Sequence, residues 1–444
     1  MKIIIAGAGE VGTHLARLLS QENQDITLMD SDEEKLILPF DLDIMTVIGN
    51  PTSIADLKRS GIKGADIFIA VTPEESINIT ACMLATNLGA LKTIARISND
   101  EYTLPKNKSF FEDLGVHSLI CPETLAVEEI AAAVKKPWSR QWWELADGKL
   151  ILAGVKVREN APIVNKYLYD LSREDKMYHI VAIKRGGTTI IPRGADQILS
   201  EDILYFITLP KYVDVIKEHT GKKDIEINQV TIMGGGRIGM KAGEFLPHNI
   251  KIKIIELDKE KSYRLAEKVE SNVLIINGDG RNTELLIQEN IRDCDAFIAV
   301  TGNSEANILA CVTAKNLGVP KTIAEVENLD YIQMAENLNI GTVINKKLIA
   351  AGHIYQFLLD ADVSTVKSLT FANAEVAELV ARPGSKITKK QIKNLNLPKD
   401  MTLGGTIRNG EAFLIDGETL IEAGDHVVVF CLDTAMRKIE DFFN

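Results

Sequence analysis

The chain has 444 residues, and its 50 basic and 62 acidic side chains give a formal net charge of −12. This charge argues against nucleic acid as the main partner and against direct adhesion to an anionic bilayer. A hydrophobic share of 45% and a charged share of 25% are typical of a soluble globular protein, and the length predicts two to four domains. We find no apolar run long enough to span a bilayer and no secretory leader, so we expect a cytoplasmic protein.

The first predicted unit runs from Lys2 to Asp30. An apolar run predicts a buried strand, which leads into Gly7-Ala8-Gly9-Glu10-Val11-Gly12 and then into a segment with helical spacing. Glycines at these three positions allow a tight turn, a close approach of backbone N–H groups to a pyrophosphate, and close helix–strand packing. A second strand ends on Asp30, where an acid can accept hydrogen bonds from a ribose. The combination predicts a nucleotide site, and a glycine turn without a ligand is the plain alternative.

Further short β-branched runs alternate with helical segments up to residue 122, which predicts a parallel sheet with helices on both faces. In such a sheet the ligand lies at the carboxyl ends of the strands. Polar residues follow three of the predicted strands there: Thr52, then Thr72-Pro73, then Arg96 and Ser98. Arg96 could neutralise a phosphate at the edge of this site.

An amphipathic helix is expected from Pro122 to Val134, followed by Trp138, Trp142 and Trp143, which are all the tryptophans of the chain. Large aromatic residues are common both in cores and at interfaces. We interpret these three as buried packing residues, and a partner anchor is the alternative. The cysteines and histidines are scattered without metal-ligand spacing, so we predict no metal site.

The second half repeats the first, which indicates a duplication. The Gly motif recurs as Gly234-Gly235-Gly236-Arg237-Ile238-Gly239, and Thr72 recurs as Thr301. Glu256 stands where the first copy has Asp30. Asp279 stands where the first copy has Asn50, and Glu325 stands where it has Arg96. Because Glu325 cannot neutralise a phosphate, we expect the first site to bind nucleotide better. An acid at both second-strand ends disfavours a 2′-phosphate, so NAD is preferred over NADP, and ATP or ADP could use the same turn and acid.

A smaller strand-rich segment follows each nucleotide lobe, and these two segments also match each other, with a polar linker after the first. We therefore predict an α/β protein with two Rossmann-type doubly wound lobes, each followed by a small α+β lobe. The expected boundaries are N lobe 1 (1–122), a crossover helix and linker (123–143), C lobe 1 (144–221), N lobe 2 (228–345), a second crossover helix (346–362) and C lobe 2 (363–444), with a final helix over Thr434–Phe443.

With this tandem order and these motifs, the chain resembles the TrkA family, the cytosolic regulatory subunits of bacterial Trk-type potassium uptake systems, whose lobes are of the RCK/KTN type. The resemblance covers essentially the whole chain. It implies binding of NAD(H) and adenine nucleotides, without catalysis, by a homo-oligomeric ring, tetrameric in our expectation. The ring would dock on the cytoplasmic face of a potassium-translocating Trk membrane subunit.

The resemblance also assigns nucleotide-binding residues, which are Gly7 to Val11, Asp30, Thr52, Thr72, Pro73 and Ser98 in the first half, and Gly234 to Ile238 and Glu256 in the second. One departure is Asn50-Pro51, where the family commonly has an acid after the glycine. The rival function is an NAD-dependent dehydrogenase, which would need a substrate domain with a proton donor. Neither small lobe offers a histidine or lysine in an identifiable catalytic setting.

Overall fold

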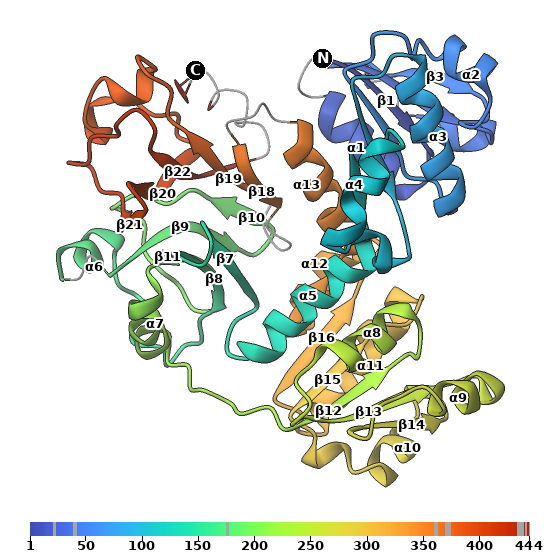
Figure 1. The fold of residues 1–444 in the computed structure, drawn as a ribbon. Coiled ribbons are helices and arrows are strands. Elements are labelled where there is room, and N and C mark those ends of the chain that lie inside the picture. Colours follow the sequence, from blue (N-terminus) through green and yellow to red (C-terminus); the bar gives the residue numbers. More distant parts are fainter. Residues whose placement is uncertain are drawn as a thin grey trace. The chain divides into compact units, whose positions relative to one another are not determined.

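The computed structural model describes residues 1–20, 24–38, 42–174, 177–358, 363–368, 374–432, 439 and 442–443 (Figure 1). The helix expected over Thr434–Phe443 lies almost entirely outside these residues. The described chain forms two compact units. One contains residues 1–125 and 346–360, and the other contains residues 126–345 and 361–444.

The first sheet is parallel and six-stranded, in the order β3-β2-β1-β4-β5-β6. This is the doubly wound Rossmann order, with the switch point between β1 and β4. Its elements are β1 (Lys2–Ala6), α1 (Glu10–Ser20), β2 (Asp25–Asp30), β3 (Met45–Ile48), α2 (Ile54–Arg59), β4 (Ile67–Ala70), α3 (Glu75–Leu88), β5 (Lys92–Arg96), α4 (Pro105–Asp113), β6 (Ser118–Ile120) and α5 (Pro122–Lys135). The strands at its centre are buried on both faces, which is why they read as continuous apolar runs.

N lobe 2 repeats this sheet in the order β14-β13-β12-β15-β16-β17. Its elements are β12 (Gln229–Met233), α8 (Arg237–Phe245), β13 (Lys251–Glu256), α9 (Lys259–Ala266), β14 (Val273–Asn277), α10 (Thr283–Gln288), β15 (Ala296–Ala299), α11 (Ser304–Asn316), β16 (Lys321–Glu325), α12 (Asp330–Asn337), β17 (Thr342–Ile344) and α13 (Lys346–Leu358). Helix α13 follows this sheet in sequence but belongs to the unit of N lobe 1, where it contacts α1 and β6.

Each small lobe is a five-stranded sheet of antiparallel pairs. Read from equivalent edges, the strand orders are β10-β9-β11-β8-β7 and β21-β20-β22-β19-β18, so the two sheets have the same topology. C lobe 1 has β7 (Gln141–Leu145), β8 (Leu150–Lys156), α6 (Leu168–Glu174), β9 (Tyr178–Arg185), β10 (Thr188–Ile190), β11 (Ile203–Thr208) and α7 (Val213–Thr220). C lobe 2 has β18 (Val363–Ser368), β19 (Ala374–Val380), β20 (Met401–Arg408), β21 (Glu411–Leu414) and β22 (His426–Leu432). The predicted fold class is confirmed.

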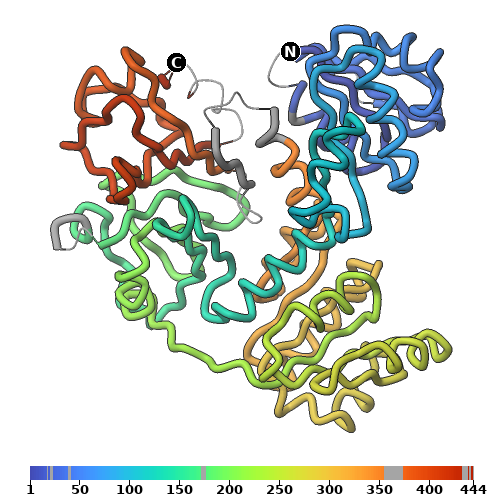
Figure 2. Tube along the Cα trace, in the orientation of Figure 1, coloured from blue at the N-terminus to red at the C-terminus, as the bar shows by residue number. Residues whose placement is uncertain are grey.

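Residues 221–228, expected as a polar linker, form the extended connection between α7 and β12 (Figure 2). The segment 123–143 contains α5 and also the start of β7, so two of the tryptophans lie in a strand of the C lobe 1 sheet. Trp138, Trp142 and Trp143 are 7%, 7% and 5% exposed, as the burial interpretation expects. The indole N–H of Trp143 donates to Glu129 Oε1 at 2.8 Å.

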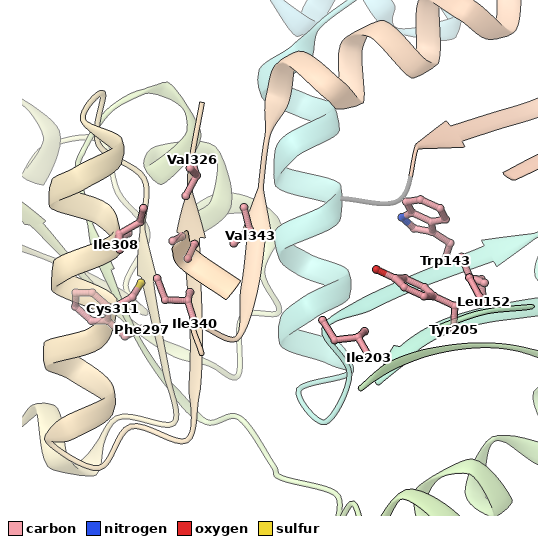
Figure 3. Packing of buried hydrophobic residues seen from close by; sticks show 14 of the residues in the cluster. Trp143, Leu152, Ile203, Tyr205, Phe297, Ile308, Cys311, Val326, Ile340 and Val343 are labelled. Carbon is pink, nitrogen blue, oxygen red and sulfur yellow. The ribbon is translucent and has the colours of Figure 1, made fainter. Parts of the chain in front are cut away.

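One hydrophobic cluster of the larger unit draws its residues from more than one lobe. It includes Phe297, Ile308 and Cys311 in N lobe 2, and Leu152 and Tyr205 in C lobe 1 (Figure 3). The two small lobes also pack on each other through a glycine. A Cβ on Gly404 would lie 2.8 Å from Phe430 Cε2 of its own sheet and 3.0 Å from Ile207 Cδ1 of the other, so the glycine leaves room for this close approach of the two sheets.

Candidate functional site

The Gly loop of N lobe 1 connects β1 to α1, and its glycines have different structural roles. Gly7 has φ +110°, and a Cβ there would lie 2.9 Å from the backbone nitrogen of Thr72. A Cβ on Gly12 would lie 1.9 Å from Gly7 O. A Cβ on Gly9, in contrast, would meet nothing within 4 Å. Gly7 and Gly12 are therefore needed by the fold itself, whereas the space over Gly9 is open to a ligand.

The loop between β12 and α8 has the same arrangement. Gly234 has φ +112°, a Cβ on Gly239 would lie 2.0 Å from Gly234 O, and Gly236 again faces open space. Of the other predicted residues here, Arg237 is exposed and Ile238 is buried at 5% exposure. In N lobe 1, Glu10 is exposed and Val11 is half-buried.

The acid at the end of the second strand is bonded to the Gly loop in both lobes. Asp30 Oδ2 accepts from the N–H of Ala8 at 2.7 Å, and Glu256 Oε2 accepts from the N–H of Gly235 at 3.2 Å. Glu256 also pairs with the Lys261 ammonium at 2.6 Å. Burial favours a higher pKa for Glu256, but the Lys261 ammonium and the Asp258 and Gly235 N–H groups outweigh it and hold the pKa below its ordinary value.

The loop after the fourth strand is held by a buried asparagine. Asn78 Oδ1 accepts from the Thr72 N–H at 2.9 Å and from its hydroxyl at 2.7 Å. Asn78 Nδ2 donates to Thr72 O at 2.9 Å and to Arg96 O at 2.8 Å. Asn307 makes the same four bonds, to Thr301 and to Glu325 O. Each asparagine thus ties the ends of the fourth and fifth strands together beside the Gly loop, while Pro73 is exposed.

Two residues predicted to bind nucleotide at and after the end of β5 already contact carboxylates of the protein. The Arg96 guanidinium lies 3.8 Å from the carboxylate of Glu123, which is 2% exposed. The N–H of Ser98 donates to Glu75 Oε2 at 2.8 Å. The expectation that N lobe 1 binds nucleotide better relied on a phosphate contact by Arg96. It stays a prediction, but Arg96 already has a carboxylate partner.

The turns after the third strand differ between the lobes. In N lobe 1, Asn50 Oδ1 accepts from the N–H and the hydroxyl of Thr52 at 2.9 and 2.8 Å. In N lobe 2, Asp279 accepts from the Arg281 guanidinium at 2.7 Å instead. The Arg281 side chain holds the pKa of Asp279 below its usual value. Arg281 therefore places a cation where N lobe 1 has the uncharged Thr52.

A cavity of about 430 Å³ lies over the Gly loop of N lobe 2. It is lined at the carboxyl ends of the parallel strands, where a doubly wound fold places its ligand. Its lining includes Gly234, Gly236, Glu256, Asp279 and Thr301 of the predicted residues, and also Lys261, Arg281 and Asn303. Sequence reasoning missed Lys261 and Arg281, because a lysine on a helix and an arginine in a turn carry no signal without the fold. Asn78 and Asn307 could have been found, because the repeat keeps them.

The Gly loop of N lobe 1 is also joined to α13. The Glu10 carboxylate forms an ion pair with Lys347, whose side chain is 8% exposed. Burial lowers the pKa of the nearby His14 to about 4, helped by the charges of Arg17 and Lys347. Among the described residues, no helix is both long enough and apolar enough to cross a membrane.

The TrkA-N domain family matches residues 3–122 and 230–346, and the TrkA-C domain family matches residues 152–221 and 376–444. The Trk system potassium uptake protein TrkA of Halomonas elongata is 32% identical over 448 residues, covering 99% of this chain and 97% of that protein. The protein of the same name from Haemophilus influenzae is 31% identical, covering 100% and 98%.

Solved structures show the same fold at lower identity. The GsuK RCK domain has a TM-score of 0.61 at 16% identity and covers 100% of this chain and 94% of its own. The GsuK channel bound to NAD has a TM-score of 0.61 at 15% identity, with 100% and 78% covered.

Proposed function

Because this chain belongs to the TrkA family, we propose that it is the nucleotide-binding regulatory subunit of a Trk-type potassium uptake system. One observation carries the proposal: two Gly loops stand in tandem, each open over its middle glycine and each backed by an acid at the end of the second strand. A tandem of two nucleotide lobes without a separate substrate domain suits a sensor better than a hydride-transfer enzyme.

The proposed ligands are NAD(H), with ATP or ADP as alternatives at the same sites. The acids support a nucleotide with a free ribose hydroxyl, and a structural relative of the same fold is described as bound to NAD. The proposed nucleotide-binding residues are Gly7, Ala8, Gly9, Glu10, Val11, Gly12, Asp30, Thr52, Thr72, Pro73, Arg96 and Ser98 in N lobe 1, and Gly234, Gly235, Gly236, Arg237, Ile238, Glu256, Asp279 and Thr301 in N lobe 2.

In the proposed mechanism no bond is made or broken. A ligand shifts a conformational equilibrium only by binding one state better than another. Such a shift would change the contacts of helix α13, because its Lys347 pairs with Glu10 of the Gly loop. A nucleotide phosphate at the N-terminus of α1 brings negative charge beside Glu10 and so competes for Lys347. Binding would thereby change the hold of N lobe 1 on α13.

The proposed assembly is a homo-oligomeric, tetrameric ring at the inner face of the membrane, docked on the potassium-translocating Trk subunit. The support is the family membership and the names of the relatives, which are those of potassium uptake proteins. The domain boundaries expected from the sequence are part of this proposal, with α13 contributed to N lobe 1 by the second half.

The test is calorimetric titration of the chain with NADH, NAD, ATP and ADP, repeated on Gly9→Asp and Gly236→Asp. The open space over each glycine is where a phosphate would lie, so an aspartate there removes that site by bulk and by charge. We expect each variant to lose one site, by about 100-fold or more in affinity, because the aspartate carboxylate takes the space of the phosphate and repels its charge.

The functional arm measures potassium flux through vesicles that hold the membrane subunit. The ligand that binds should change the flux with the wild-type chain and should change it less with the variants. Absence of nucleotide binding to a folded wild-type chain would refute the proposal. Turnover of NADH with hydroxy or amino acids, followed by absorbance, would favour a dehydrogenase instead.

A further inference from the structure

Cations gather where C lobe 1 meets N lobe 2, in a chain whose net charge is −12. We call this group the cationic junction. It consists of Arg140 before β7, Lys156 at the end of β8, Arg158 after it, Lys222 after α7, Lys315 on α11 and Lys321 at the start of β16. None of these residues belongs to the Gly loops or to the cavity above them.

Hydrogen bonds bring cations of the two lobes together. Lys321 Nζ donates to Ser139 O at 2.7 Å and to Thr342 Oγ1 at 2.9 Å, which places it beside Arg140. The Arg140 guanidinium donates to the side chain of Asn339, and Lys315 Nζ donates to the backbone oxygen of the same residue at 2.6 Å. Three cations therefore meet within one bonded network.

The Glu201 carboxylate acts on Arg140, Lys222 and Lys315, and the Glu336 carboxylate acts on Arg140. Lys156 and Arg158 share the Glu201 carboxylate at 2.9 and 3.0 Å. Burial raises the pKa of Glu336 above its ordinary value, against the charges of Lys184, Arg140 and Lys156, which favour its ionised form. At Lys222 and at Lys315, the charges of Arg140, Lys156 and Arg158 are opposed by that of Glu201.

The junction has a buried base and an accessible rim. Arg140 and Lys321 at the base are 8% and 2% exposed. The Arg158 side chain is 43% exposed, and Lys222 and Lys315 are half-buried. Two of the three ammonium protons of Lys321 are used in the bonds given above, which leaves one donor. The exposed rim, unlike the base, is open to a small solute.

The crowding of these charges is costly in the absence of an anion. Burial, together with the charges of Arg158 and Arg140, lowers the pKa of Lys222 to about 8. Burial, together with the charge of Arg140, lowers the pKa of Lys321 to about 7. A bound anion would reduce the repulsion between these cations and could accept a hydrogen bond from them.

We propose that the cationic junction is a binding site for a small, multiply charged phosphate-type anion, distinct from the two Gly loops. Guanidinium and ammonium groups at several angles suit the tetrahedral oxygens of such an anion. Because its cations come from both lobes, the bound anion holds C lobe 1 against N lobe 2. The site is thus a second input to the same molecule, independent of whether the Gly loops bind nucleotide.

The experiment titrates sodium tripolyphosphate, at constant ionic strength, into the full-length Gly9→Asp/Gly236→Asp chain by calorimetry. Saturable binding is expected in this background. Adding Lys222→Glu should weaken it at least about tenfold, since a cation at the rim becomes an acid. Adding Lys223→Glu, at the exposed neighbouring position, should leave it unchanged. Arg158→Gln provides a second rim variant, and thermal unfolding checks that each variant is folded.

Absence of saturable binding would overturn the proposal, and so would equal losses in Lys222→Glu and Lys223→Glu. If wild-type chain binds tripolyphosphate and the Gly-loop variant does not, the anion belongs to the nucleotide sites and the junction is refuted. Sedimentation with phosphatidylglycerol vesicles, against phosphatidylcholine vesicles, tests the other source of phosphate. Vesicle binding that depends on Lys222, without tripolyphosphate binding, would replace the small anion by a membrane surface.

Discussion

At the scale of single residues, the two halves keep the same buried asparagine for the same physical reason. Asn78 and Asn307 are 0% exposed, and each satisfies both its amide and its carbonyl with strand-end groups. A buried polar group is tolerated only when it is bonded in this way. The asparagine therefore fixes the loop that lies against the first glycine of the motif.

Replacing Asn78 by alanine should lower stability by about 2–4 kcal/mol, because the Thr72 and Arg96 backbone groups lose their partners. Hydrogen exchange of the β4 and β5 amides measures the local loss. Asn87→Ala is the matched control on the same helix, since Asn87 is exposed and its side chain donates to the nearby Met83 O. A loss of less than about 0.5 kcal/mol in Asn78→Ala, as expected for the control, would contradict the clamp.

Lys321 gives a prediction of pH dependence. Its pKa is lowered to about 7 by burial and by Arg140, below the ordinary 10.5 of the unfolded chain. Between these values the unfolded state holds a proton that the folded state does not, so stability rises with pH from about 7 to about 10.5 and falls as pH drops toward 7.

Unfolding midpoints measured across that pH range should rise less steeply in Lys321→Met than in the wild type. The control is Lys92→Met, at the matching place of the first half, where the lysine is exposed. Equal slopes for wild type and Lys321→Met would show that Lys321 remains charged in the folded protein.

At the scale of elements, each small lobe is closed by an arginine–aspartate pair. Arg185 donates to both oxygens of Asp202 at 2.9 and 2.7 Å, and Arg408 does so to Asp425 at 2.8 and 2.6 Å. Both aspartates are 1% exposed and also accept the N–H that begins their turn, from Leu199 and from Glu422. The pair ties the turn to the neighbouring strand, so these repeated acids are structural.

Asp202→Asn should destabilise C lobe 1 by about 2 kcal/mol, because the amide cannot accept both guanidinium bonds and a partly buried cation is left without its counter-charge. Exchange of the β11 amides, or the shift of the unfolding midpoint, checks the loss. Asp214→Asn, whose side chain is 86% exposed, should change stability little. Equal effects in the two variants would contradict a structural role for Asp202.

At the scale of the whole molecule, the halves are not independent copies. Helix α13 follows the second parallel sheet in sequence and packs with the first, through α1 and the Glu10–Lys347 pair. A duplication alone would give two separate modules. The exchange of this helix makes the first Gly loop part of a unit that the second half completes.

Lys347→Gln should weaken the coupling of nucleotide to potassium flux more than it weakens nucleotide binding. The coupling free energy between two sites is typically about 1–3 kcal/mol. Removing the Lys347 charge, which pairs with Glu10, should reduce this coupling energy by about half or more. Calorimetry gives the binding and vesicle flux gives the coupling. Arg17→Gln, exposed on the same α1, is the control. Full ligand control in Lys347→Gln would exclude this route through α13.

The order of strands and the position of the Gly loops were predictable from the sequence because they depend on local signals. Apolar runs of strand length, glycines at fixed spacing and an internal repeat are properties of neighbouring residues, and the structure confirms the fold class that they indicated. The cations Lys261 and Arg281 over the second loop, and Glu123 beside Arg96, were not predictable. Some of these residues meet their partners only because the fold brings distant segments together, and the others belong to no sequence motif.

Lys92-Thr-Ile-Ala95 and Lys321-Thr-Ile-Ala324 show where the sequence stops deciding. Each run forms the fifth strand of its parallel sheet, as the repeat predicts. Yet Lys92 is exposed and Lys321 is 2% exposed, because the segment between α5 and β7 lies against the second strand, where the backbone oxygen of Ser139 accepts a hydrogen bond from Lys321. The sequence alone determined the strand, its sheet and its family. Only the packing of distant segments decided the burial, and with it the charge and chemistry, of an identical residue.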